Sequence, residues 1–278
     1  MKPFKVIGYD TGKVHTTEIV KAILEPLGGE LLPVKQFDKL PDADLVVISG
    51  ILRGTGLVFK QCVADKRDFL FVDHAYFQKG YDHPNWMRIS RNRHSFGPSL
   101  INSSSKRFNT FFSRKMSPWR GGTVKHILLM PPTHAISWLF DAHDWEEKTV
   151  ARLKSITNRP IEVRGKPNNP IVDELGNLLY LDNSQAGGPS LAEDLADAYA
   201  AVIYNSNAAI ECLQAGVPVI CEDACAATAI SFKYEDIDTP IIAFEPRRQQ
   251  LFYDLANSQF TREEMRTGKL PEALLGRL

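Results

Sequence analysis

Short apolar runs alternate with amphipathic stretches along most of the chain. Near the N-terminus, residues 5–10, 42–50 and 68–77 have the apolar character of strands. From about Thr16 the sequence follows a helical period that stops at Gly28 and the glycine after it. Strands that alternate with helices favour a parallel α/β sheet, whose ligands bind beyond the carboxyl ends of its strands. We therefore expect a site where these strands end.

A second alternating pattern begins beyond a stretch rich in Ser, Asn, Gly and Pro, a composition typical of loops. The sequence predicts two lobes, residues 1–120 and 121–250, and amphipathic helices over residues 251–278 that pack back on the first lobe. Thr261 and Glu264 have the spacing of a capping box in that tail. In the second lobe we expect strands at 126–132, 160–167, 201–207 and 217–223, and helices at 144–156, 190–200 and 208–216.

The composition is that of an ordinary globular protein. The chain has 278 residues, of which 44% are hydrophobic and 24% charged, and this excludes a disordered or fibrous protein. No apolar run reaches the length of a membrane span, and no secretory segment is evident, so we expect a cytoplasmic protein, in the host cytoplasm if phage-encoded. The cysteines lack CxxC spacing, and we interpret them as buried free thiols: Cys62, Cys212, Cys221 and Cys225.

The charge is unevenly placed although the net charge is zero. Residues 83–140 contain nine Lys and Arg residues, interleaved with aromatic residues, and no Asp or Glu. Cations beside stacking aromatics are typical of nucleic-acid binding, and an anionic lipid or polysaccharide would also suit them. A solvated basic loop with aromatic residues in the core explains the same pattern. The candidate acceptor-binding residues are Arg88, Arg91, Arg93, Lys106, Arg107 and Trp119.

The stretch YNSNAAIE places a polar turn where an apolar run opens into a helix. The first N–H groups of a helix have no partner within it, so Ser206 and Asn207 either cap that end or let a phosphate approach the backbone. Arg164 and Lys166 follow a neighbouring predicted strand, where they would clamp a diphosphate or be solvated surface charges. Glu211, one turn into the helix, suits ribose hydroxyls or an exposed helical position.

These segments together resemble a known family. The elements VRGKP, YNSNAAIECLQAGVPVI and FYDLANSQFTREEMRTG are similar to the donor-binding half of GT-B glycosyltransferases, in the branch of bacterial capsule polysaccharide transferases and phage DNA glycosyltransferases. The resemblance covers residues 123–268, and epimerases of the same fold share part of the signature. It implies an α/β fold of GT-B type, with two Rossmann-like lobes whose parallel sheets face each other across a cleft. Lys166 stands where many members of the family carry His.

The resemblance also implies a donor and its contacts. A nucleotide sugar, most simply a UDP-sugar, would be held by its diphosphate at Ser206, Asn207, Arg164 and Lys166. Its base and ribose would lie near His134 and Glu211. No permanently bound cofactor and no metal are implied.

In such enzymes the catalytic base comes from the first lobe. Asp73 and His74 follow a predicted strand, and a carboxylate suits removal of the proton from the acceptor hydroxyl. We assign Asp73 as the base, with His74 as its alternative or its orienting partner, and Asp10 as a third candidate. A metal site that uses Asp73, His74, Asp82 and His83 is a minor alternative, because the spacing lacks a helical i, i+4 pair.

The sequence therefore predicts a glycosyltransferase whose acceptor is a 5-hydroxymethyl pyrimidine, such as hydroxymethylcytosine, in double-stranded DNA. Phage relatives modify such bases, and the basic aromatic segment suits a DNA-binding role. Three alternatives remain open: transfer to a capsule or surface polysaccharide, a nucleotide-sugar epimerase, and a non-catalytic DNA-binding protein.

Overall fold

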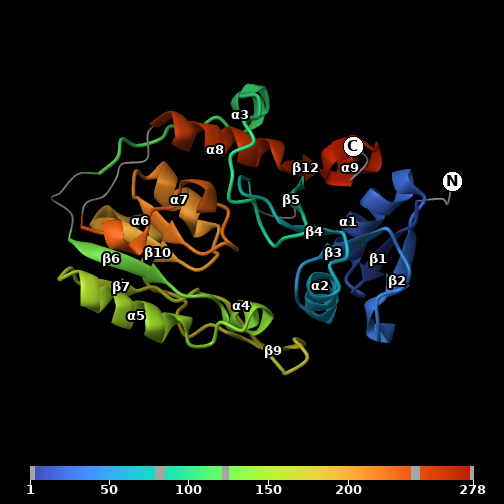
Figure 1. The fold of residues 1–278 in the computed structure, drawn as a ribbon, viewed down its shortest axis with the longest axis horizontal. Coiled ribbons are helices and arrows are strands. Elements are labelled where there is room, and N and C mark those ends of the chain that lie inside the picture. The colour runs from blue at the N-terminus through green and yellow to red at the C-terminus, as the bar shows by residue number, and fades with distance from the viewer. Residues whose placement is uncertain (1–3, 79–84, 121–124, 239–244, 276–278) are drawn as a thin grey trace. The chain divides into compact units, whose positions relative to one another are not determined.

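The computed structural model describes residues 4–78, 85–120, 125–238 and 245–275 (Figure 1). The chain divides into two compact units. The first contains Met1–Ser95, Val172–Leu179 and Ser258–Leu278, and the second contains Phe96–Ile171 and Tyr180–Asn257. The basic segment predicted to belong to the first lobe thus groups with the second unit from Phe96 onward.

The first unit is built on a six-stranded sheet in the order β12-β5-β4-β3-β1-β2. The four strands from β4 to β2 are parallel, whereas β5 runs antiparallel to both β4 and β12. Because two antiparallel steps restore direction, β12 runs parallel to β4. The strands are β1 (Val6–Asp10), β2 (Glu30–Pro33), β3 (Leu45–Ser49), β4 (Phe69–His74), β5 (Trp86–Arg91) and β12 (Gln259–Thr261).

The helices of the first unit cover this sheet with apolar faces. The helix α1 (Val14–Leu24) packs Ile19, Val20 and Ile23 into a core with apolar residues of β1, β3 and β4. Positions i, i+1 and i+4 lie on one side of a helix, so the apolar residues that gave the helical pattern in the sequence are also the residues buried in the structure. The other helices are α2 (Thr55–Ala64), α9 (Arg262–Arg266), which packs on α1, and α10 (Glu272–Leu275). The capping box predicted at Thr261 and Glu264 is present at the start of α9.

The second unit is built on a four-stranded parallel sheet in the order β11-β10-β6-β7. Leu153 of α5 packs against Ile127 and Leu129 of β6 on one face, and Figure 1 shows α7 on the opposite side from α5. Two further strands, β8 and β9, form a separate two-stranded sheet whose Val172–Leu179 part groups with the first unit. The strands are β6 (His126–Met130), β7 (Ile161–Val163), β8 (Asn169–Val172), β9 (Leu178–Asp182), β10 (Ala198–Ile203) and β11 (Val219–Cys221). The helices are α3 (Lys106–Phe111), α4 (His134–Phe140), α5 (Trp145–Ile156), α6 (Leu191–Ala196), α7 (Ala208–Gln214) and α8 (Glu245–Asn257).

The predicted fold class, α/β with two Rossmann-like units, is confirmed. One predicted helix is wrong in extent, because α6 ends at Ala196 and the residues beyond it form β10. The apolar run AYAAVI is fully buried in the centre of the sheet, where packing outweighs the helical propensity of its alanines. Two elements in or beside the basic segment, β5 and α3, are absent from the prediction.

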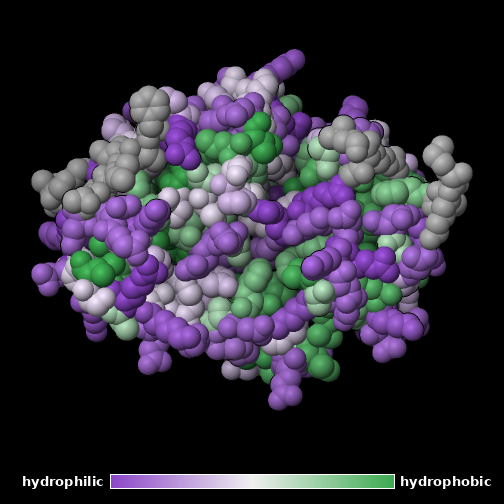
Figure 2. All heavy atoms as spheres, in the orientation of Figure 1, coloured by the Kyte–Doolittle hydropathy of each residue, from purple (hydrophilic) through white to green (hydrophobic). Residues whose placement is uncertain are grey.

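No helix among the described residues combines the length and the apolar character that crossing a bilayer requires. Figure 2 shows hydrophilic residues over most of one face, with smaller apolar patches between them.

Gly216, in the turn between α7 and β11, is expected to be intolerant of a side chain. Its φ is +78°, and a Cβ there would lie 2.0 Å from the carbonyl oxygen of Pro118. We expect Gly216→Ala to lower the free energy of unfolding by about 2 kcal/mol, measured by urea denaturation. Gly28 also has positive φ, +63°, but open space around it, so Gly28→Ala should cost about 1 kcal/mol. If both variants lose the same free energy of unfolding, the close contact between residue 216 and the Pro118 carbonyl oxygen contributes nothing to the loss.

Candidate functional site

The order of the second sheet defines where a ligand is expected to bind. The chain passes from β6 to β7 on one side and then returns to β10 on the other side of β6. The loops after β6 and β10 therefore diverge, and in parallel α/β sheets such a switch point is the usual ligand crevice. Met130 and Ile203 pair across this point, and the Tyr204 N–H donates to the carbonyl oxygen of Met130 at 3.3 Å.

The loop after β6 leads into α4. The side chain of Thr133 accepts a hydrogen bond from the N–H of Ile136, which caps the helix. The N–H of His134 donates to Oδ1 of Asn169 at 2.8 Å, and its ring lies 6.0 Å from that of His143. His134 thus lies at the switch point.

The loop after β10 carries the polar turn that the sequence analysis singled out. Ser206 and Asn207 are half-buried directly before α7, and the Ser206 hydroxyl accepts a hydrogen bond from the N–H of Ala208 at 3.2 Å. The thiol of Cys225, from the loop after β11, donates to the Ser206 carbonyl oxygen at 3.9 Å. Ser206, one residue before the N-cap Asn207, therefore accepts the first N–H of α7, and the loops after β10 and β11 support each other.

The two cations predicted to clamp a diphosphate differ in their surroundings. The backbone N–H of Arg164 donates to Leu129 of β6 at 2.8 Å, which holds Arg164 at the same edge of the sheet. Its guanidinium donates to the carboxylate of Asp194 and to the carbonyl oxygen of Pro189. Lys166, two residues farther on, is exposed. A diphosphate at this edge would meet Lys166 directly and compete with Asp194 for Arg164.

Glu211 is exposed on α7. Burial lowers the pKa of Arg114, and the nearby Glu211 carboxylate partly offsets this. Glu211 therefore interacts with the basic segment as well as standing one turn into the helix.

In the first unit, Asp73 lies at the carboxyl end of β4 and is paired with Arg88 of β5. The two residues face each other in the antiparallel register, and Nη2 of Arg88 lies 2.7 Å from Oδ2 of Asp73. The other carboxylate oxygen accepts the backbone N–H of His74 at 2.8 Å. Burial raises the pKa of Asp73, but Arg88, His94, His74 and the hydrogen bond from the His74 N–H together lower it more, so the pKa lies below its ordinary value.

The third candidate base, Asp10, has a structural role at the end of β1. Its Oδ1 accepts hydrogen bonds from the Thr17 hydroxyl and from the Gly12 N–H. These bonds, in that order of size, hold the pKa of Asp10 below its ordinary value. Asp10 therefore fixes the loop that leads into α1.

The prediction for Arg88 as an acceptor-binding cation is corrected by the structure. Its side chain is 4% exposed and its charge is matched by Asp73, so it cannot track phosphates on a surface. The sequence shows where cations lie along the chain but not which groups they pair with. The partner of Arg88 lies on β4, the antiparallel neighbour of its own strand.

Other cations of the basic segment also have partners within the protein. Arg91 donates to Asp68 and to two carbonyl oxygens of α10, and Arg107 donates to the carbonyl oxygen of Ala256 at 3.0 Å. Arg93 and Lys106 are exposed. Trp119 is half-buried, with the guanidinium of Arg248 4.2 Å from its ring centroid. Four of the interleaved aromatic residues belong to the core: Trp86, Phe96, Phe108 and Phe112.

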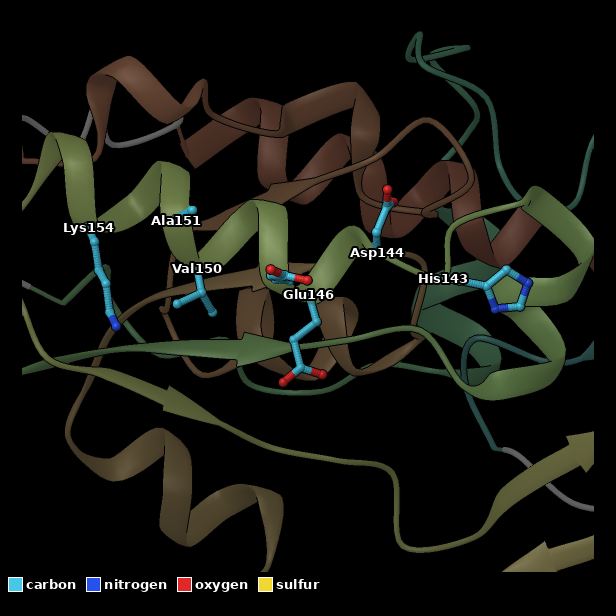
Figure 3. Close-up of a pocket in the computed structure, with 7 residues that line it drawn as sticks. His143, Asp144, Glu146, Val150, Ala151 and Lys154 are labelled. Carbon is cyan, nitrogen blue, oxygen red and sulfur yellow. The ribbon is translucent and has the colours of Figure 1, made fainter.

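A surface depression lies along α5, and one of its lining residues, His143, has its ring 6.0 Å from that of His134. Figure 3 shows its lining along one side of α5, from His143 and Asp144 to Lys154. Most of the lining side chains are exposed and belong to this one helix. It therefore lacks the convergent loops that distinguish the carboxyl edges of the two sheets.

Within the described part of the chain, no group of three His, Cys, Asp or Glu side chains is placed to hold a metal ion. Asp82 and His83, the other two ligands of the alternative metal site with Asp73 and His74, lie outside the described residues.

Comparison with known proteins gives fold-level similarity only. No family model matches the chain, and no curated protein matches it. Among solved structures, a KpsC β-Kdo 2,4-transferase of Thermosulfurimonas dismutans is 11% identical, with 92% of this chain and 91% of that chain covered and a TM-score of 0.46. A KpsC β-Kdo 2,7-transferase of the same organism is 12% identical, with 96% and 100% covered and a TM-score of 0.44. The UDP co-structure of MnaA from S. aureus is 11% identical, with 100% and 98% covered and a TM-score of 0.31.

Proposed function

We propose that the protein is a nucleotide-sugar-dependent glycosyltransferase. The observation that carries this proposal is the switch point between β6 and β10, because cations and a polar helix start gather at one carboxyl edge there. Ser206 and Asn207 stand at this edge on one side, and Arg164 and Lys166 on the other. A helix start beside two cations suits a diphosphate, which would take the first N–H groups of α7 in exchange for their bonds to Ser206 and Asn207, and a UDP-sugar is the donor we assign.

The second unit is assigned to the donor. Lys166 would contact the diphosphate as a point charge, and Arg164 would contact it in exchange for part of its bonding to Asp194. The base and ribose would lie near His134, the first residue of α4, and near Glu211, in the first turn of α7.

The first unit is assigned to the acceptor hydroxyl and the base. In an inverting transfer, the acceptor oxygen forms a bond to the anomeric carbon while the bond from that carbon to the phosphate oxygen breaks. The hydroxyl proton passes to the carboxylate of Asp73, and the nucleoside diphosphate leaves with the bonding electrons. The pair with Arg88 orients the Asp73 carboxylate, and because it also lowers the pKa of Asp73, the base is a weak one until that pair loosens.

The acceptor we favour is a polysaccharide or other saccharide. The guanidinium groups of Arg88, Arg91 and Arg107 are committed to partners within the protein, which leaves fewer cations for a nucleic-acid backbone. A hydroxymethylpyrimidine in duplex DNA is the second candidate, favoured by the exposed Arg93 and Lys106.

The test is a panel of nucleotide sugars incubated with the full chain and with candidate acceptors, followed by mass spectrometry. The acceptors are oligosaccharides and duplex DNA that contains hydroxymethylcytosine or hydroxymethyluracil. A hexose-sized or pentose-sized mass gain on an acceptor supports the proposal and identifies its class. Conversion of the donor sugar to its epimer without any acceptor would show an epimerase instead, and no change in any donor would contradict both.

Lys166 offers a direct test of donor binding. We expect Lys166→Met to raise the Kd for UDP by about fivefold, measured by calorimetry, because an exposed cation contributes modestly to a phosphate contact. The matched control is Lys125→Met, since Lys125 is an exposed cation that precedes β6 at the opposite edge of the sheet. Equal Kd values for both variants and the unaltered protein would place the diphosphate elsewhere.

A further inference from the structure

Residues 101–115, which contain α3, are held against α8 within the second unit. The ring of Phe108 packs against that of Phe252, with 6.0 Å between their centroids. The buried carboxylate of Asp254 on α8 accepts the backbone N–H of Ile101 at 2.9 Å. The backbone that carries the outward side chains of this segment is therefore fixed by contacts with α8.

Two large apolar side chains of the segment face solvent. Ile101 is 61% exposed, and Phe111, the last residue of α3, is 49% exposed, whereas Phe108 and Phe112 are buried. Figure 2 shows an apolar patch bordered by hydrophilic side chains close to the position of α3 in Figure 1. Single exposed apolar side chains are ordinary on protein surfaces, so the charges around these two decide what the surface can bind.

The same segment carries an excess of positive charge. Residues 101–115 contain four cations and no Asp or Glu: Lys106, Arg107, Arg114 and Lys115. The helices α7 and α8, which bond to the segment, do not cancel this charge. On α8 two arginines match two acids, and α7 has one acid, Glu211, so three positive charges remain in excess.

The two arginines of the segment keep their charges although they are bonded. Arg107 donates to the carbonyl oxygen of Ala256 at 3.0 Å, and Arg114 donates to Oε1 of Gln214 at 3.2 Å. Both acceptors are neutral, so they orient the guanidinium groups without neutralising them. Lys106 and Lys115 are exposed. The surface therefore combines exposed apolar side chains with cations that a neighbouring anion can reach.

We propose that residues 101–115 bind the surface of an anionic lipid bilayer. The four cations contact the anionic headgroups, and Ile101 and Phe111 enter the boundary between the headgroups and the acyl chains. This proposal goes beyond the proposed glycosyltransferase and does not depend on it.

A bilayer suits this surface better than a nucleic acid does. Single-stranded bases stack on exposed aromatic rings. The segment exposes one large aromatic ring, and its other large exposed apolar side chain, Ile101, offers no face for stacking. Hydrocarbon accepts both side chains equally, and headgroup charge attracts the cations around them.

The test is co-sedimentation of the full chain with lipid vesicles. Vesicles of phosphatidylcholine alone are compared with vesicles in which about 30% of the lipid is phosphatidylserine. We expect the partition coefficient to be about tenfold higher for the vesicles that contain phosphatidylserine. It should fall as salt is added, because ions screen the attraction between the cations and the headgroups.

Variants separate the contributions of charge and apolar contact. Lys106→Gln combined with Lys115→Gln should lower the partition coefficient by about tenfold, and Phe111→Ser should lower it by about fivefold. The matched controls are Lys154→Gln on α5 and Leu175→Ser between β8 and β9, which change an exposed cation and an exposed apolar side chain elsewhere. Both controls should bind vesicles as the unaltered protein does. All of these side chains are exposed, so every variant should keep the Tm of the unaltered protein.

Equal partition into the two kinds of vesicle, or partition into neither, would overturn the proposal, as would variants that bind like their controls. A loss in the double lysine variant with no change in Phe111→Ser would also overturn it, in favour of a contact made by charge alone. A short DNA duplex that binds the full chain and loses affinity in the double lysine variant, while vesicles do not bind, would indicate a nucleic acid instead.

Discussion

Asp73→Asn is expected to lower kcat by about a thousandfold while the Kd for UDP stays within twofold of the unaltered protein. The amide occupies the same space at the end of β4 and still accepts the His74 N–H, but it cannot take a proton from the acceptor. Donor binding is assigned to the second unit, so it should not respond. The measurement is steady-state transfer with the acceptor that the panel identifies, beside UDP calorimetry.

The matched control for this substitution is Asp68→Asn. Asp68 precedes β4 at the opposite edge of the sheet and is also paired with an arginine, Arg91. It should leave kcat nearly unchanged. A small effect of Asp73→Asn, together with a large effect of His74→Gln on kcat, would transfer the role of base to His74.

The elements that define the candidate donor edge could be predicted from the sequence because their signals are local. The strands around Leu129 and Ile203 are continuous apolar runs, and the polar turn at Ser206 follows one of them directly. Alternation of strands and helices then fixes which strand ends share an edge. For this reason Arg164 and Ser206 could be assigned to one edge from the sequence, whereas His134 was implied only by the resemblance to GT-B glycosyltransferases.

The partners of the charged side chains could not be predicted, because they depend on pairing between distant segments. Arg88 meets Asp73 only because β5 turns back antiparallel to β4. Arg164 meets Asp194 from a helix 30 residues farther along the chain. The number of cations in residues 83–140 indicates a polyanionic ligand. In the structure, however, several of these cations pair with groups of the protein itself and stabilise the fold.

Arg88→Met is expected to lower the free energy of unfolding by about 4 kcal/mol at pH 7.5, because it leaves the Asp73 charge without its partner. The loss should shrink as the pH falls. In the unaltered protein the lowered pKa of Asp73 stabilises the fold above the unfolded value, and this contribution disappears only as pH falls through the folded value. Without Arg88, burial raises the pKa, so Asp73 takes up a proton in the folded state and the penalty is relieved under mildly acidic conditions.

Urea denaturation of the unaltered protein and of Arg88→Met at pH 7.5 and pH 5 measures this effect. Adding Asp73→Asn to Arg88→Met removes the unpaired charge, so the double variant should recover part of the lost stability at pH 7.5 and show little dependence on pH. Arg93→Met, in the exposed turn after β5, is the matched control and should change stability by less than about 0.5 kcal/mol. A loss in Arg88→Met that is the same at both pH values, and unrelieved in the double variant, would mean that Arg88 stabilises the sheet by packing. In that case the charge of Asp73 would be set by other groups, and His94, whose charge also lowers the pKa of Asp73, would be the first to examine.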